Sequence, residues 1–393
     1  MNFLEILYFV LVAFNIVAVI SGNRNNILAL ISFAFIMLFI SGIQYNGTVV
    51  GYDLRNYELL YDDTELINKF EFGFKFINDI GNNIGLNFEQ FRFALIFVCA
   101  LAIIRVACQM NANLNLLIVA YLMYFIMPAS VQLKNLCAIT VFLQIFPIPN
   151  KITKLFFLKA FSLIMIAASI HFSFWGYIIF IFAFSKLHKV KKIYKVVFYV
   201  MLVITVILVL LRVDLIFAPI FNIITLALGD ASDVYAKRYD TVTGMSSLVS
   251  VSLLVFSMLA IKFWRKSIYK VSSTIKNDCK KILVSRKSMP VFLERLRPFH
   301  FNLECIYNCV LLSSLFFPLL IVNATFYRLI RDVTLVVIFH LASNCNNRSM
   351  SVNKRMIILL FVLGICVGWF AFDIIIKGYT DEFFSNYFID GDL

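Results

Sequence analysis

The stretch ITKLFFLKAFSLIMIAASIHFSFWGYIIFIFAFS, residues 152–185, decides the fold. It is apolar almost throughout, and the polar residues Ser169, His171 and Ser173 interrupt it near the middle. Lysines flank both ends, so we expect two membrane helices that leave and re-enter the cytoplasm, with His171 at the outer tip. Each limb of about 15 residues spans only about 22 Å, less than the roughly 30 Å hydrocarbon core, which predicts that His171 is sunk below the outer surface.

The rest of the chain has the same apolar character. Of its 393 residues, 62% are hydrophobic, 16% are aromatic and only 15% are charged. Soluble proteins carry about 25% charged residues, and one soluble core could not bury so much apolar surface. The composition therefore excludes a soluble multidomain protein and predicts an all-α polytopic integral membrane protein.

Apolar stretches bounded by polar clusters predict about twelve transmembrane helices, which form a single transmembrane domain over residues 1–393. The first stretch lacks a basic n-region and carries Glu5, so we interpret it as a retained helix and not as a signal peptide. The predicted spans are 3–20, 27–43, 91–107, 114–128, 132–147, 152–169, 172–185, 196–211, 247–263, 303–321, 326–342 and 356–376.

Charged residues are segregated between the predicted loops. Residues 262–298 hold eleven basic and two acidic side chains, whereas residues 44–90 hold three basic and eight acidic ones. By the positive-inside rule, the basic loop 264–300 is cytoplasmic, and the two larger loops 44–90 and 212–246 are external. Both termini then face outward. The basic patch favours anionic membrane lipid, and not nucleic acid, as its partner.

No cofactor signature accompanies this architecture. None of the eight cysteines falls in the two long external loops, so no disulfide framework is implied. Cys305 and Cys309 share a helix face but have no nearby pair of histidines, and adjacent Asp62 and Asp63 are only a weak signal for a divalent cation. P-loop, dinucleotide, HExxH and GxSxG motifs are absent. We therefore expect no metal and no other cofactor.

Basic residues gather at the outer ends of two predicted spans, on the side that topology usually depletes of cations. Lys134 begins one of these spans, and Arg328 with Arg331 begins another. The two arginines are three residues apart, so they share a helix face and could grip a phosphate or diphosphate together. Snorkelling to the interface is the alternative for each cation, and Asp332 could neutralise one arginine in a structural ion pair.

Other candidate residues lie at the hairpin tip and in the first external loop. An ionisable group at membrane depth is costly, so we favour a functional role for His171 over a histidine satisfied by a neighbour such as Ser173. The segment GYDLRNYELLY places Asp53 and Arg55 near Tyr57. A carboxylate beside tyrosines suits sugar binding through hydrogen bonds and ring stacking, although a solvated loop carboxylate is the commoner case.

The segment FEFGFKFI, residues 70–77, has an aromatic residue at every second position. This alternation is typical of a β-strand, but no partner strand is evident. An interfacial segment that dips into the lipid headgroups is the equal alternative.

Taken in order, GYDLRNYELLY, FEFGFKFI, QLKNLCAITVF, HFSFW and FYRLIRD resemble the motifs of the EpsG-like branch of the Wzy-type O-antigen and exopolysaccharide repeat-unit polymerases. That family's pattern is a G-x-D-x-x-x-Y loop, an E-P-G-[FY] segment, an R-Q-x-x-A helix start, an H-x-S turn and a late helix that contains arginine. The resemblance covers almost the whole chain. It departs at Phe72, where Pro is usual, and at Lys134 with Asn135, where Arg with Gln are usual. Lysine offers a point charge where arginine offers a bidentate fork.

The resemblance implies a GT-C-like glycosyltransferase of the bacterial inner membrane. It implies polymerisation of undecaprenyl-diphosphate-linked oligosaccharide repeat units into lipopolysaccharide O-antigen or exopolysaccharide at the periplasmic face, where both termini would also lie. The catalytic residues would be His171 and Asp53. The substrate-binding residues would be Arg328, Arg331, Lys134, Arg55 and Tyr57. The diphosphate already activates the donor, so neither a metal nor another cofactor is implied. The partners would be the lipid-linked donor and acceptor and a chain-length regulator protein.

A lipid-linked oligosaccharide flippase is the main alternative function, in which the same cations would line a translocation cavity. A flippase should show two related halves and short external loops, and this chain shows neither. A membrane sugar acyltransferase is a third function, but its His and Arg would face acyl-CoA in the cytoplasm. The polymerase is therefore the function that the sequence favours.

Overall fold

The computed structural model describes residues 3–22, 25–41, 49–62, 71–149, 152–184, 190–211, 247–263, 304–322, 326–346 and 350–373. In these ranges every regular element is a helix and none is a strand, which confirms the predicted all-α fold. The predicted loops 212–246 and 264–300 lie outside the described residues, as do residues 44–48 and 63–70 of the first predicted loop.

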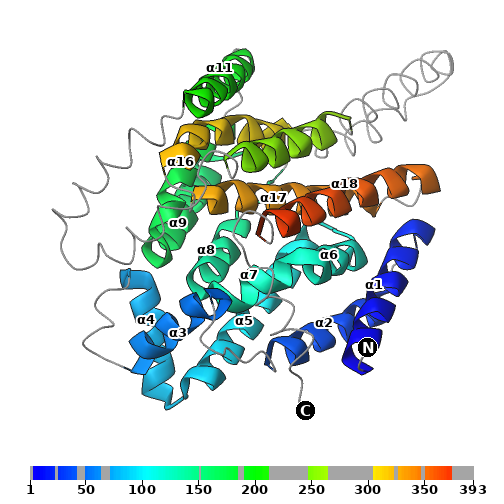
Figure 1. The fold of residues 1–393 in the computed structure, drawn as a ribbon, viewed down its shortest axis with the longest axis vertical. Helices are drawn as coiled ribbons and strands as arrows, with labels where there is room; N and C mark the ends of the chain where they lie inside the picture. Colours follow the sequence, from blue (N-terminus) through cyan, green and yellow to red (C-terminus); the bar gives the residue numbers. More distant parts are fainter. Residues whose placement is uncertain are drawn as a thin grey trace.

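The described ranges form a series of helices along the chain (Figure 1). The first half of the chain forms α1 (Phe3–Ser21), α2 (Asn26–Ser41), α3 (Val49–Asp62), α4 (Phe72–Ile84), α5 (Phe88–Gln109), α6 (Leu114–Ala120), the π-helical turn Tyr121–Phe125, α7 (Ile126–Val131), α8 (Leu133–Leu143) and α9 (Lys154–Ile170). After a 3₁₀ segment, Phe172–Ile179, come α10 (Phe180–Ala183), α11 (Val190–Leu210) and the helical stretch Ser247–Phe263. The helical stretch Glu304–Leu320 then overlaps with α16 (Phe317–Val322), and α17 (Tyr327–Cys345) and α18 (Val352–Ala371) follow.

Every apolar stretch that was predicted to span the membrane contains a helical segment within its described residues. Three of them, Phe88–Gln109, Lys192–Leu210 and Val352–Ala371, are long and apolar enough to cross a membrane, and the other apolar helices are shorter. On α11, Val196 is 60% exposed and Leu210 is 75% exposed, as expected of a helix that faces lipid. The protein is therefore a helical membrane protein, while the number of its spans and their orientation stay predictions.

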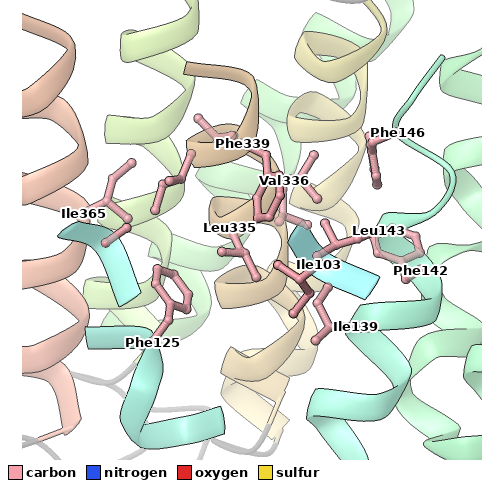
Figure 2. Close-up of a cluster of buried hydrophobic side chains, with 14 of the residues drawn as sticks. Ile103, Phe125, Ile139, Phe142, Leu143, Phe146, Leu335, Val336, Phe339 and Ile365 are labelled. Atoms are coloured by element: carbon pink, nitrogen blue, oxygen red, sulfur yellow. The ribbon is translucent and has the colours of Figure 1, made fainter. Parts of the chain in front are cut away.

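Helix α17 forms the centre of the bundle. Its side chains are buried all around its circumference, which is typical of a helix surrounded by other helices. Figure 2 shows Leu335 and Val336 of α17 among Ile365 of α18, Phe125 of the π-helical turn and Ile139 of α8. The start of α17, which carries the predicted arginines, is therefore held by packing on several sides.

Helix α4 includes most of the segment with alternating aromatic residues. Phe74, Asn78 and Gly81 are its buried residues, and their spacing is that of one helix face. Phe72 is 79% exposed and Phe76 is 57% exposed. The strand alternative is therefore wrong, because the helical period continues through the residues that follow the short alternation. An apolar exposed face fits the interfacial alternative.

The beginning of α4 lies directly against the end of α9. A Cβ atom on Gly73 would come within 2.8 Å of the carbonyl carbon of Ser169, closer than real side chains approach backbone. Only glycine allows this contact. Because Glu71 precedes α4 and His171 follows α9, the close approach brings these two side chains together.

Candidate functional site

Glu71 connects two of the predicted site residues. The Lys134 ammonium donates a hydrogen bond to Glu71 Oε2 at 2.8 Å. Glu71 Oε1 lies 3.6 Å from His171 Nδ1 and accepts a hydrogen bond from the Phe172 backbone N–H at 3.4 Å. We call Lys134, Glu71 and His171 the Glu71 triad. Its members come from the start of α8, the start of α4 and the end of α9.

The electrostatics of the triad set its protonation near neutral pH. Burial tends to raise the pKa of Glu71, but the interactions with His171 and Lys134 outweigh it and lower the pKa to about 2. Burial lowers the pKa of His171 below its ordinary value; the Arg328 and Lys134 charges lower it further, and Glu71 opposes them. Glu71 is therefore an anion and His171 a neutral imidazole, which can accept a proton.

Arg331 lies close to the triad and is almost completely buried, with 2% of its surface exposed. One terminal nitrogen, Nη2, donates to Gln132 Oε1 at 2.7 Å, and the guanidinium carbon lies 5.4 Å from the Tyr327 ring centroid. The other terminal nitrogen, Nη1, is buried and has no hydrogen-bond partner among the described residues. A buried charged donor without an acceptor is costly, so Nη1 is suited to an anionic oxygen of a ligand.

The neighbouring Asp332 is directed toward other groups. Its Oδ1 accepts from Asn135 Nδ2 at 3.2 Å, and its Oδ2 lies 3.4 Å from the Tyr177 hydroxyl. Tyr177 in turn donates to the Leu329 carbonyl at 2.8 Å. These bonds join the starts of α8 and α17 to the 3₁₀ segment after His171, and so hold the three elements in one arrangement.

The structure brings four of the seven predicted site residues to this end of the bundle. Lys134 and His171 share Glu71, Arg328 is half-buried and acts electrostatically on His171, and Arg331 binds Gln132, two residues before Lys134. Lys134 and Arg328, which were predicted from separate spans, therefore both act on one histidine.

The three other predicted residues belong to α3. Tyr57 is 7% exposed, and its ring packs 5.6 Å from that of Phe74, so it makes a packing contact in place of an open stacking face. Asp53 precedes Tyr57 by one helical turn. The side chains of Asp53 and Arg55 lie outside the described part of the chain.

Sequence reasoning did not select Glu71, Gln132 or Tyr177. Glu71 is the one acidic residue of FEFGFKFI, and it matches the Glu of the family's E-P-G-[FY] segment. That match is a signal by which the sequence could have identified it. Gln132 adjoins the chosen helix start, whereas Tyr177 stands in an apolar run with no distinguishing neighbour. In the described ranges, no group of three or more His, Cys, Asp and Glu side chains could hold a metal ion.

The arrangement combines a neutral imidazole with a buried guanidinium that has a donor available for an anion. Such a pair can accept a proton and stabilise a departing anion in the same reaction. No curated protein and no solved structure matches the chain. The sequence model of the EpsG family matches residues 26–389, nearly the whole chain, and this chain therefore belongs to the EpsG family.

Proposed function

We propose that this protein is a glycosyltransferase that polymerises undecaprenyl-diphosphate-linked oligosaccharide repeat units at the periplasmic face of the bacterial inner membrane. EpsG family membership supports a role in polysaccharide polymerisation in general. The observation that carries the finer proposal is the buried, unpartnered Nη1 of Arg331 at the same end of the bundle as the neutral imidazole of His171. Its product would be lipopolysaccharide O-antigen or exopolysaccharide.

In the proposed reaction, a hydroxyl of the acceptor sugar attacks the anomeric carbon of the donor sugar. The new C–O bond forms as the bond to the diphosphate breaks, and the lipid diphosphate leaves as an anion. Arg331 and Arg328 hold that diphosphate and stabilise its developing charge. His171 accepts the hydroxyl proton, and Asp53 of α3 is the alternative base. The diphosphate activates the donor, so the proposal needs no other cofactor.

Glu71 has a positioning role in this proposal. Its Oε1 is close to Nδ1 of His171, so it orients the ring with the opposite nitrogen, Nε2, toward substrate. The carboxylate also stabilises the imidazolium that proton transfer creates. Lys134 is already paired with Glu71 at 2.8 Å, so we propose that its ammonium fixes this carboxylate and contributes only part of its charge to the diphosphate.

The remaining parts of the proposal concern the surroundings of the site. The acceptor sugar would lie toward α3, where Arg55 and Tyr57 were predicted to bind substrate. Both termini would be periplasmic, and a chain-length regulator protein would be a partner in the membrane. No nucleic acid takes part.

The test uses a deletion strain that carries either the wild-type chain or the variants Arg331→Ala and His171→Ala at matched membrane abundance. We expect the empty strain and both variants to place one repeat unit on each acceptor without a polymer ladder. Arg105→Ala is the matched control, because Arg105 is an exposed arginine on α5 away from the site. Loss of even the single unit in the empty strain would show a flippase or an earlier step, and would overturn the proposal.

A further inference from the structure

An apolar groove lies between α2, α5 and the helical stretch that runs from α6 to α7. About 90 Å³ of it is accessible to the centre of a water-sized molecule, and the space along it amounts to about 790 Å³ when the part open to the outside is included. Small side chains, among them Ala29 on α2 and Ala100 on α5, leave room along its walls. Tyr121 is the one described lining residue whose side chain carries a hydroxyl. Protein interiors are closely packed, so an empty space of this kind requires an occupant or a reason to stay open.

The groove is long and reaches the protein surface. Leu114 and Ala129 both line it, and the helical stretch between them is about 22 Å long. Leu30 also lines it and is 60% exposed, and its neighbours Ile27 and Ile31 are 72% and 54% exposed. The mouth of the groove therefore opens onto an apolar surface, which in a membrane protein faces lipid.

One end of the groove adjoins the cationic site. Leu136 lines the groove, and its backbone N–H donates to the Gln132 carbonyl at 2.9 Å. The side chain of the same Gln132 accepts from Arg331 at 2.7 Å. Tyr121, on the groove wall, is within the electrostatic influence of Asp332. The groove thus reaches to within one helical turn of Gln132, the residue that binds the buried guanidinium.

We infer that this groove binds the isoprenoid chain of the lipid diphosphate whose head lies at Arg331. This inference rests on the proposed function and adds a second binding site to it. An apolar groove with a cation at one end matches a ligand with one long hydrocarbon chain and an anionic head. A phospholipid fits less well, because its glycerol backbone and second chain would have to pass the buried Arg331 and Gln132.

The experiment measures binding of undecaprenyl phosphate to the purified full chain in phosphatidylcholine nanodiscs, with phosphatidylglycerol as the competitor. Ala100→Phe fills the groove. Val98→Phe is the matched control, because Val98 is on the same helix, is 61% exposed and is not among the lining residues. We expect Ala100→Phe to weaken binding by at least about tenfold, since displacing even two methylene groups from an apolar site has that effect. Val98→Phe should bind as wild type does.

A second variant guards against misfolding of the first, and a competing phospholipid tests whether the groove is selective. Ala29→Leu fills the groove from α2 with a smaller change, and it replaces Ala100→Phe if that variant does not elute as a single species. Wild-type affinity in the filled variants would overturn the inference, and so would equal displacement by phosphatidylglycerol. Binding is measured without polymerisation. If the wild-type chain binds undecaprenyl phosphate through the groove but the deletion strain still makes a polymer ladder, the inferred lipid site is supported and the proposed polymerase function is contradicted.

Discussion

Two buried polar clusters lie at opposite ends of α17. Near the end of α17, Asn113 donates its backbone N–H to the Ala342 carbonyl, and beside it Asn115 donates to Asn15 Oδ1 at 2.9 Å. Asn15 Nδ2 donates to Ser32 Oγ at 2.7 Å. This amide cluster of Asn15, Ser32 and Asn115 is neutral. At the start of α17, Glu71, Lys134 and Arg331 are charged.

The two clusters differ in whether their buried polar atoms have hydrogen-bond partners, and this difference distinguishes polar groups that hold the fold from polar groups that can bind a ligand. None of the buried unpartnered side-chain atoms in the described ranges belongs to Asn15, Ser32 or Asn115, as expected of groups that specify helix packing. At the other end, His171 Nδ1 has no hydrogen bond within normal limits, and Arg331 Nη1 and Asn135 Oδ1 have no partner among the described residues. Unpartnered buried atoms also occur near the end of α17, at His340 Nε2 and Asn344 Oδ1. The start of the helix differs because its unpartnered donor, Arg331 Nη1, carries a permanent positive charge, which suits an anionic ligand.

The largest effect should come from His171. We expect His171→Ala and His171→Asn to reduce polymerisation by about 10²- to 10⁴-fold, because neither side chain can accept the hydroxyl proton. Ladder intensity at matched membrane abundance measures the loss. His340→Ala changes a histidine near the other end of α17 and should keep the ladder. If both histidine variants lost polymer equally, the contrast between the two ends of α17 would fail.

The second-largest effect on polymerisation should come from Arg331. We expect Arg331→Ala to reduce polymer formation by about 10²- to 10³-fold, as removal of one donor to a developing anion does elsewhere. Arg331→Lys should recover only part of it, since lysine lacks the planar fork, and Arg328→Ala should also lose polymer. The quantity to compare is polymer per unit of membrane protein. Wild-type chain length in both alanine variants would show that the arginines only anchor α17.

Glu71 should have an intermediate effect with a signature in pH. Glu71→Gln keeps the size of the side chain and removes its charge, and we expect about a tenfold loss. Polymerisation should fall on acidification, because protonated His171 cannot act as a base. Glu71 raises the pKa of His171, so its removal lowers that pKa and moves the acid limb to lower pH. The pH profile is measured in membrane vesicles supplied with lipid-linked repeat units. If the acid limb of the Glu71→Gln variant lies at the same pH as that of the wild type, Glu71 has a purely structural role.

Polymerisation by Lys134 variants should decrease as the positive charge at this position is removed and then reversed. Lys134→Arg should keep polymerisation, since arginine can still pair with Glu71. Lys134→Ala should weaken it, and Lys134→Glu should weaken it most, because a second carboxylate would stand beside Glu71 and the diphosphate. The banding of the three variants at equal abundance gives the order. A Lys134→Glu ladder equal to wild type would remove this residue from the site.

The smallest effect on polymer should come from the amide cluster. Asn115→Ala leaves Asn15 Oδ1 without its donor and should lower the free energy of unfolding by about 1–3 kcal/mol. Thermal unfolding of the purified protein should show this loss, while the ladder stays at wild-type length once abundance is matched. If Asn115→Ala lost polymer without losing stability, the amide cluster would have a role in the reaction, as the charged cluster is proposed to have.

Local features of the sequence were enough to predict the all-α membrane architecture. Apolar runs identify helices because each helix closes its own backbone hydrogen bonds within the segment, which lipid requires. The shared face of Arg328 and Arg331 follows from their spacing, and the position of His171 between two helices follows from the polar break around it. These inferences need no knowledge of distant residues.

The tertiary structure alone decided which residues meet. Glu71 pairs with Lys134 across 63 positions and with Phe172 across 101, and Arg331 binds Gln132 across 199. No local pattern encodes such pairs, because they depend on how helices pack and on a contact as close as that of Gly73 with Ser169. For the same reason the alternating aromatics of 70–77 left a strand and an interfacial segment open as alternatives, and burial against α9 decided for one helical face.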